Sequence, residues 1–209
     1  MKDQIRMYHG GMVDCNGYLV ETPEGFIAID APAGMTDWLL ERRPDAKITH
    51  LLITHMHFDH VEDAARMKKQ FGCKIFAHSP YNDDLTLSRI ASTAWHMRIA
   101  VDEFVVDEAF TSEMHTANWG GLHWLIHHVP GHSPDSVAYH LPDEKIMFVG
   151  DIIFAGSVGR TDFPGGSLSQ LRKGIHDRIF NQEADTRLYP GHGPYTSIGE
   201  ESLSNPYLA

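Results

Sequence analysis

Short apolar runs separated by turn residues open the chain. Residues 17–20 and 26–29 are mostly apolar, and the sequence Thr22-Pro23-Glu24-Gly25 lies between them. Because Pro and Gly favour tight turns, this pattern predicts a β-hairpin within the first thirty residues.

A strand, a helix and a second strand are predicted between residues 48 and 77. Residues 48–54 are too short and too rich in β-branched side chains for a buried helix. From Val61 to Phe71 the apolar positions recur at helical spacing, and Gly72 is placed to end that helix. Residues 74–77 then have the composition of a strand, so this segment is expected to form a strand-helix-strand unit.

The second half of the chain has strand-like segments with one helical segment among them. Residues 122–129 alternate imperfectly, but their residue types favour a strand, and Pro142-Asp143-Glu144 is a typical turn. The elements expected here are strands at 137–141, 145–149 and 187–189, the last of them the final strand, and an amphipathic helix at 168–179.

This order of elements favours an α+β fold over a doubly wound parallel sheet. Strands come first and are followed by strands mixed with isolated helices, which indicates two sheets with helices on their outer faces. A length of 209 residues predicts one domain over 1–209. Residues 79–121 have no clean period, and two interpretations stay open: a helical excursion packed by its aromatic residues, or a lid over the substrate.

Composition and charge exclude several classes of protein. Hydrophobic residues make up 42% and charged residues 22%, which disfavours collagen-like, coiled-coil and disordered chains. The formal net charge is −11, so the field of the protein repels phosphate backbones and no nucleic-acid partner is expected.

The sequence also favours a cytoplasmic protein with no membrane partner. No segment approaches the roughly 18 consecutive apolar residues of a membrane helix, and the charged N-terminus lacks the apolar stretch of a secretory signal. The two cysteines, Cys15 and Cys73, form neither a disulfide framework nor a C-x-x-C motif. Reduced thiols are therefore expected.

Histidine is the residue type that points to chemistry. The chain has 15 histidines, and histidine is the commonest metal ligand in proteins. His55, His57, Asp59 and His60 form the pattern H-x-H-x-D-H where a predicted strand gives way to a predicted helix. In such a loop His55 and His57 can point to one side while Asp59 and His60 turn towards a neighbouring point, which suits two metal ions. Asp59 alone could instead cap the helix.

Three further candidate ligands follow the ends of predicted strands. His132 lies in Pro-Gly-His-Ser-Pro, Asp151 follows Val149-Gly150, and His192 lies in Pro-Gly-His-Gly-Pro. Each residue taken alone is a common structural one. Their joint position after strands allows the loops to converge on the place that the H-x-H-x-D-H loop occupies.

The order of these motifs resembles that of the metallo-β-lactamase-fold hydrolases, and within them the short glyoxalase II-like branch. Residues 55–60, 131–132, 150–151 and 191–192 carry the resemblance, and residues 156–164, 189–194 and 205–208 are similar to the short hydroxyacylglutathione hydrolase-type proteins of bacteria. The resemblance implies an αββα sandwich of two mixed β-sheets. It also implies one metal ion bound by His55, His57 and His132, a second bound by Asp59, His60 and His192, and Asp151 bridging the two.

That arrangement is typical of hydrolysis by a hydroxide shared between two divalent ions. Zinc is favoured, with iron and manganese as alternatives, because one set of nitrogen and oxygen ligands accepts all three. Asp59 and Asp151 are the candidate catalytic carboxylates, with Asp59 orienting the hydroxide. Thioesters are favoured over amides because a thiolate, with a pKa near ~8.5, leaves without a general acid.

The substrate is expected to be a small-molecule thioester or ester. Arg160 resembles the basic residue with which glyoxalase II meets substrate carboxylates, although a plain surface arginine is the alternative. Asp162 stands where that family tends to have an aromatic residue, and no C-terminal helical domain of the full-length enzyme is evident, so a glutathione conjugate is one option among several. The sequence allows a homo-oligomer.

Two alternatives to a hydrolase are retained. Persulfide dioxygenases, which use a single iron, resemble the chain in the H-x-H-x-D-H loop and in residues 159–163. A metal-binding domain without catalysis would keep the ligands but has no need of Arg160. Asp30, His50 and His78 are candidates for orienting the ligand histidines. His127 and His128 are not assigned to metal, because neighbours in a strand face opposite sides.

Overall fold

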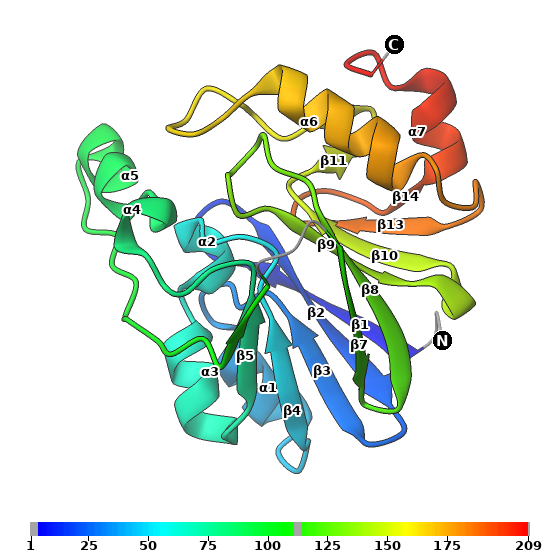
Figure 1. The fold of residues 1–209 in the computed structure, drawn as a ribbon. Helices are drawn as coiled ribbons and strands as arrows, with labels where there is room; N and C mark the ends of the chain where they lie inside the picture. Colours follow the sequence, from blue (N-terminus) through cyan, green and yellow to red (C-terminus); the bar gives the residue numbers. More distant parts are fainter. Residues whose placement is uncertain (1–3, 111–113, 209) are drawn as a thin grey trace. The chain divides into compact units, whose positions relative to one another are not determined.

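The computed structural model describes residues 4–110 and 114–208. The chain divides into two compact units, Met1–Phe110 and Thr111–Ala209. Figure 1 colours the first unit from blue to green and the second from green to red, and each unit is built on its own six-stranded sheet.

The sheet of the first unit has its strands in the order in which they occur along the chain. Strands β1, β2 and β3 pair antiparallel, whereas β3 to β6 pair parallel. The predicted hairpin is confirmed, because Thr22 pairs with Gly25 and leaves a two-residue turn between β2 and β3. The strands are β1 (Ile5–Gly10), β2 (Cys15–Thr22), β3 (Gly25–Ile29), β4 (Ile48–Leu52), β5 (Lys74–Ala77) and β6 (Glu108–Ala109).

Helices α1 (Met35–Arg42) and α3 (Ala64–Phe71) pack on this sheet through a shared apolar cluster. Leu39 and Met67 from the helices are buried with Leu51, Ile53 and Ile75 from the parallel strands and their ends. As predicted, α3 ends at Gly72, which has a φ of 65° and donates its N–H to Lys68. The predicted helix is interrupted near its start, where α2 (Phe58–Val61) precedes α3.

The sheet of the second unit has the order β14-β13-β10-β9-β8-β7, and only β10 and β13 pair parallel. Helix α6 continues into a π-helical turn, Ile175–Ile179, and together they bury Leu171, Ile175 and Ile179 against the sheet. The strands are β7 (Met114–Trp119), β8 (Leu122–His128), β9 (Val137–Leu141), β10 (Ile146–Gly150), β13 (Arg187–Pro190) and β14 (Thr196–Ser197), with α6 (Leu168–Gly174), α7 (Ile198–Ser204), a 3-10 turn at Pro142–Glu144 and a small ribbon of β11 (Ile153–Phe154) and β12 (Ser157–Val158).

Several predicted elements need correction. The strand predicted at 187–189 is not the last one, because β14 and α7 follow it. The helix predicted over 168–179 is α-helical only to Gly174 and π-helical beyond it. In the segment 79–121 the structure has α4 (Asp83–Thr86), α5 (Ser88–Trp95), β6 and β7, while residues 111–113 of that prediction lie outside the described residues. A lid role for this segment stays a prediction.

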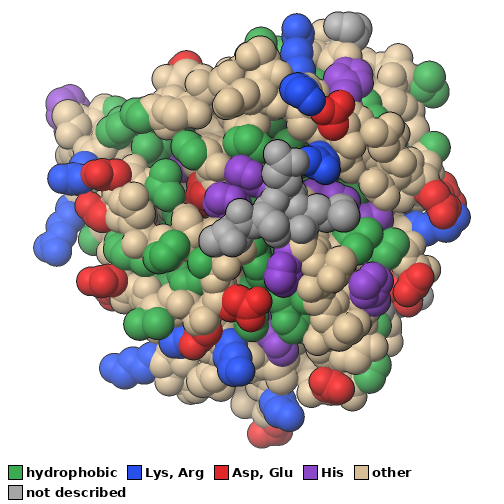
Figure 2. Space-filling view, viewed as in Figure 1, with side chains coloured by type: hydrophobic (Ala, Val, Ile, Leu, Met, Phe, Trp, Pro, Cys, Tyr) green, Lys and Arg blue, Asp and Glu red, His purple; other side chains and the backbone are tan. Residues whose placement is uncertain are grey.

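The predicted fold class is confirmed as two mixed β-sheets carrying helices. The single domain over 1–209 stays a prediction. Within residues 4–110 and 114–208, no helix has both the length and the apolar character needed to cross a membrane. On the face shown in Figure 2, basic and acidic side chains are interspersed among the described residues.

A buried histidine pair lies in the sheet of the second unit. His127 on β8 and His140 on β9 are each 2% exposed, and their Nε2 and Nδ1 atoms are 3.4 Å apart. Burial lowers the pKa of both imidazoles to about 4, with Arg178 adding to the shift of His127 and His127 adding to that of His140. Both rings are therefore neutral at pH 7.

We expect this pair to make the protein sensitive to acid. The folded state binds protons more weakly than the unfolded chain, whose histidines titrate near 6.5, so stability is full above that pH and is lost as the pH falls towards 4. At pH 5 each histidine can lower the free energy of unfolding by on the order of 2 kcal/mol. The effect of each is smaller where the two titrations are coupled. His140→Phe should shrink the difference in unfolding free energy between pH 7 and pH 5, measured by urea titration. The control is His123→Gln, an exposed histidine on β8, the strand of His127, and an unchanged difference in His140→Phe would contradict the expectation.

Candidate metal centre

The H-x-H-x-D-H loop leaves the end of β4 and is fixed there by a buried carboxylate. Asp30, directly after β3, accepts hydrogen bonds from the backbone N–H and the hydroxyl of Thr54, at 2.7 and 2.8 Å. Parallel strands β3 and β4 end at the same edge of the sheet, which brings Asp30 beside the loop. Asp30 has a φ of 56°, a backbone conformation that Asp adopts more readily than most residues.

The three histidines of this loop lie close together in the first unit. The ring centroids of His55 and His57 are 4.5 Å apart, and those of His55 and His60 are 4.1 Å apart. All three rings are buried, as is Asp59. The loop therefore holds three histidines and one aspartate together within the first unit, and their assignment to two metal ions stays a prediction.

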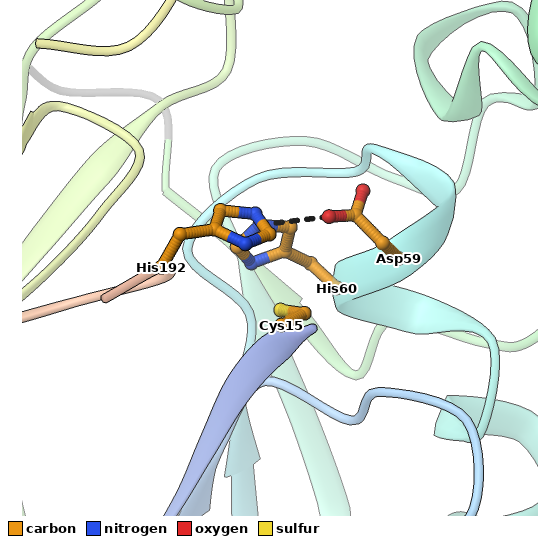
Figure 3. A group of neighbouring side chains, drawn as sticks. All are labelled: Cys15, Asp59, His60 and His192. Atoms are coloured by element: carbon orange, nitrogen blue, oxygen red, sulfur yellow. Dashed lines mark ion pairs between the residues drawn. The ribbon is translucent and has the colours of Figure 1, made fainter. Parts of the chain in front are cut away.

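The spacing between Asp59 and His60 is that of two ligands of one ion. His60 Nε2 and Asp59 Oδ2 are 3.6 Å apart, which is too long for a hydrogen bond (Figure 3). Two ligand atoms at about 2.1 Å from a tetrahedral ion are separated by roughly 3.4 Å. The two side chains are thus placed so that one cation can contact both.

Hydrogen bonds orient the histidine rings. His60 Nδ1 lies 2.8 Å from Asp30 Oδ2, and His55 Nδ1 lies 3.1 Å from the Thr54 hydroxyl. An Nδ1–H donated to a carboxylate leaves Nε2 as the basic atom of the ring, which is the state that binds metal. Asp30 therefore has the orienting position that the sequence suggested for it, whereas His50 contacts the hydroxyl of Thr49 and the ring of Phe76.

The second unit brings its three candidate ligands together around one carboxylate oxygen. Asp151 Oδ2 is 3.5 Å from His132 Nε2 and 3.6 Å from His192 Nε2. These oxygen–nitrogen distances are long for hydrogen bonds and match the separation of two ligand atoms that bind the same ion. One carboxylate oxygen thus faces the imidazole nitrogens of both candidate histidines.

Glycines allow the loops of the second unit to approach closely. A Cβ on Gly159 would lie 1.9 Å from the carbonyl oxygen of Asp151 and 2.8 Å from His132 Nδ1. A Cβ on Gly131 would lie 2.4 Å from the backbone nitrogen of Leu171, and its φ of 137° is strained for other residues. The backbone of Gly191 donates to the carbonyl of Gly150, which joins the loops of His192 and Asp151.

Arg160 acts on this cluster through its backbone, while its side chain is engaged elsewhere. Its carbonyl accepts the Nδ1–H of His132 at 2.7 Å, which again leaves Nε2 for metal. Its guanidinium forms two hydrogen bonds of 2.7 Å with Asp162 and lies 4.1 Å from the centre of the Phe163 ring. The guanidinium lowers the pKa of Asp162 to about 2.

Negative charge gathers beside the loop of the first unit. Burial, together with the neighbouring carboxylates of Asp59 and Asp63, raises the pKa of Glu62 to about 7. Like charges held this close repel one another, and a bound cation relieves that repulsion. The local field therefore favours a metal ion next to Asp59.

Sequence reasoning missed one residue of this neighbourhood. The Sγ of Cys15, an oxygen of Asp59 and a ring nitrogen of His60 all lie within 4.8 Å of one another. Figure 3 draws these neighbouring side chains together. Burial raises the pKa of the Cys15 thiol, while the imidazole of His60 acts to lower it. Cys15 lies 44 residues before Asp59 in the chain and belongs to no spacing motif, so no sequence signal pointed to it.

Comparison with known proteins decides the family. The model of the metallo-β-lactamase superfamily matches residues 10–192, a range that contains all seven candidate ligands. The chain belongs to the metallo-β-lactamase superfamily. The family predicted from the motifs is thus confirmed.

Relatives in this superfamily are similar over nearly the whole chain. Hydroxyacylglutathione hydrolase GloC of Haemophilus influenzae is 34% identical over 196 residues, which cover 92% of each chain. The crystal structure of TTHA1623, described as a di-iron-bound form, has a TM-score of 0.83 and 32% identity and covers 97% of this chain and 100% of that one. BLEG-1, described as a B3 metallo-β-lactamase, has a TM-score of 0.84 and 27% identity and covers 98% of this chain and 99% of that one.

We expect Asp30→Asn to weaken metal binding. The carboxamide oxygen must accept from Thr54, so its NH₂ group would face His60 Nδ1 and move the ring proton to Nε2, where it blocks metal. The expected loss of affinity is about 10–100-fold, as for other residues that orient metal ligands.

Zinc affinity, measured by competition with a chelating dye, tests this expectation. Asp107→Asn is a matched control, because the Asp107 carboxylate likewise accepts a hydrogen bond from a backbone N–H, that of Ile75. Wild-type affinity in Asp30→Asn would contradict the role assigned to Asp30.

Proposed function

We propose that this member of the superfamily is a dinuclear metal-dependent hydrolase that cleaves small-molecule thioesters. The observation that carries the proposal is the position of Asp151, whose Oδ2 faces Nε2 of both His132 and His192 at 3.5–3.6 Å. Family membership and the relatives support a metal-dependent hydrolase in general. The similarity to a hydroxyacylglutathione hydrolase supports thioesters in particular.

Four of the proposed ligands belong to the first unit and three to the second. Their donor atoms are imidazole nitrogens and carboxylate oxygens, a set that suits zinc, iron or manganese. The di-iron form described for TTHA1623 makes iron a candidate beside zinc. In this proposal His55, His57 and His132 would hold one ion, Asp59, His60 and His192 would hold the other, and Asp151 would be a ligand of both.

Two divalent ions, when bound, acidify an attacking water and polarise the carbonyl of the substrate. The residues of the chain have distinct parts in this reaction. Asp59 and Asp151 hold the charge of the site and accept hydrogen bonds from the water, which orients its lone pair towards the carbonyl carbon. Asp30 and the carbonyl of Arg160 keep Nε2 of His60 and His132 unprotonated. The departing thiolate needs no proton from the protein, because its pKa is near ~8.5.

Arg160 is proposed to bind a carboxylate of the substrate. Its guanidinium is exposed and already holds a carboxylate, that of Asp162, in a two-pronged arrangement. A substrate carboxylate would exchange with Asp162. A glutathione conjugate is one substrate with suitable carboxylates, and the cytoplasmic location predicted from the sequence stays part of the proposal.

We expect His192→Ala to lose one of two metal ions and the hydrolase activity. Several kcal/mol of transition-state stabilisation depend on the metals, so release of thiol from S-lactoylglutathione should fall by about 10³-fold or more. Elemental analysis should show about one ion per chain instead of two. His176→Ala is the control, because His176 lies in the π-helical turn and contacts the carbonyl of Leu208.

Two outcomes would contradict the hydrolase. Full thiol release in His192→Ala would remove the second ion from the mechanism. One iron per chain in the wild type, with oxygen uptake in the presence of glutathione persulfide and no thioester cleavage, would identify a persulfide dioxygenase instead.

Changes at Arg160 and Asp162 should move KM in opposite directions. Arg160→Gln should raise KM for S-lactoylglutathione about tenfold, since a charged hydrogen bond contributes roughly 1.5 kcal/mol. Asp162→Asn should lower that KM, because it releases the guanidinium. A neutral thioester should show neither effect. Arg187→Gln, which removes a cation over the Tyr195 ring, is the control. Equal KM values for all variants would show that Arg160 does not bind a carboxylate of the substrate.

A further inference from the structure

The proposed function makes no use of Cys15, yet this side chain lies beside two of its ligands. Cys15 is the first residue of β2, and its side chain is completely buried. Its Sγ lies within 4.8 Å of a carboxylate oxygen of Asp59 and a ring nitrogen of His60 (Figure 3). All three residues belong to the first unit, so β2 and α2 bring this cluster together within one sheet-and-helix assembly.

The three donor atoms have spacings that one ion can bridge. Metal–sulfur bonds of about 2.3 Å and metal–nitrogen or metal–oxygen bonds of about 2.1 Å place neighbouring ligand atoms roughly 3.0–3.6 Å apart around an ion with four or five ligands. Asp59 Oδ2 and His60 Nε2 are already at 3.6 Å. Asp30 holds the ring of His60 through Nδ1, so Nε2 stays directed towards the ion that Cys15 would share.

The second cysteine shows what a purely structural cysteine looks like here. Cys73 is 2% exposed and packs in the apolar cluster with Met67 and Ile75, where it behaves as a small hydrophobic residue. Cys15 instead lies beside a carboxylate and an imidazole, and its Sγ donates a weak hydrogen bond of 3.8 Å to the carbonyl of Asn16.

We propose that the Cys15 thiolate is an additional ligand of the ion that Asp59 and His60 bind. This inference rests on the proposed function, because it concerns one of the two ions of that site. On binding, the S–H bond breaks, a sulfur–metal bond forms and the proton passes to solvent, with no change of oxidation state. A thiolate is a soft ligand, so it shifts the preference of this position towards zinc and cadmium and away from manganese.

X-ray absorption at the zinc edge of the fully loaded wild-type protein tests the ligand directly. The expected result is a sulfur neighbour at about 2.3 Å from zinc, in addition to nitrogen and oxygen neighbours at about 2.0–2.2 Å. The sulfur signal should persist in Cys73→Ser and disappear in Cys15→Ser. A wild-type spectrum with nitrogen and oxygen neighbours only would overturn the proposal, and this result requires no variant to fold.

Cobalt substitution gives an independent readout. Co²⁺ in the wild type and in Cys73→Ser should produce near-ultraviolet thiolate-to-cobalt absorption, which Cys15→Ser should lack while it keeps the visible bands of bound cobalt. Visible bands without thiolate absorption in the wild type would overturn the role of Cys15 and leave the dinuclear hydrolase standing. Failure of the wild type to bind cobalt or zinc at all would overturn both proposals.

Discussion

The buried carboxylate of Asp30 is the constraint on which the position of the candidate ligands in the first unit depends. It is 2% exposed and accepts from the backbone and hydroxyl of Thr54 and from Nδ1 of His60. These contacts fix the start of the histidine loop and the tautomer of one of its ligands at the same time. Backbone hydrogen bonds from Asp30 to Leu52 and from Ala31 to His60 tie the same residues to the sheet. The position of Nε2 of His60 therefore follows from the register of β3 and β4.

In the second unit, backbone groups orient a candidate ligand. The carbonyl of Arg160 orients His132, and Gly159 leaves the space for that contact. In both units the ligands follow the ends of strands, where the sheet is rigid but side chains reach beyond it. Rigid strands and short loops thus limit the rotation of these imidazoles. The pairing of β10 with β13 positions Asp151 beside the imidazoles of His132 and His192.

The sequence predicted those elements whose apolar pattern and turn residues agree. The hairpin at 22–25, the helix that ends at Gly72 and the strands flanking the 3-10 turn at 142–144 are examples. Edge strands β1 and β7 were not predicted, because an edge strand such as β1 pairs on one side only and exposes residues such as Arg6 and Met7. The π-helical turn after Gly174 was also missed, since it keeps buried residues at nearly helical spacing.

Among the site residues, motif spacing found those that lie near one another in the chain or follow a glycine at a strand end. Cys15 lies on another strand, and only the pairing of strands brings it beside Asp59 and His60, so no local pattern could predict it. Arg160 was chosen for its side chain, whereas the structure shows its carbonyl on His132 and its guanidinium on Asp162. Backbone contacts of this kind have no residue-type signature and cannot be predicted from sequence.

We propose that seven side chains of one chain bind two metal ions. Native mass spectrometry of the protein after saturation with zinc and removal of the excess measures that number directly. We expect a dominant species with two zinc ions per chain. A dominant species with a single ion, unchanged by further zinc, would contradict it.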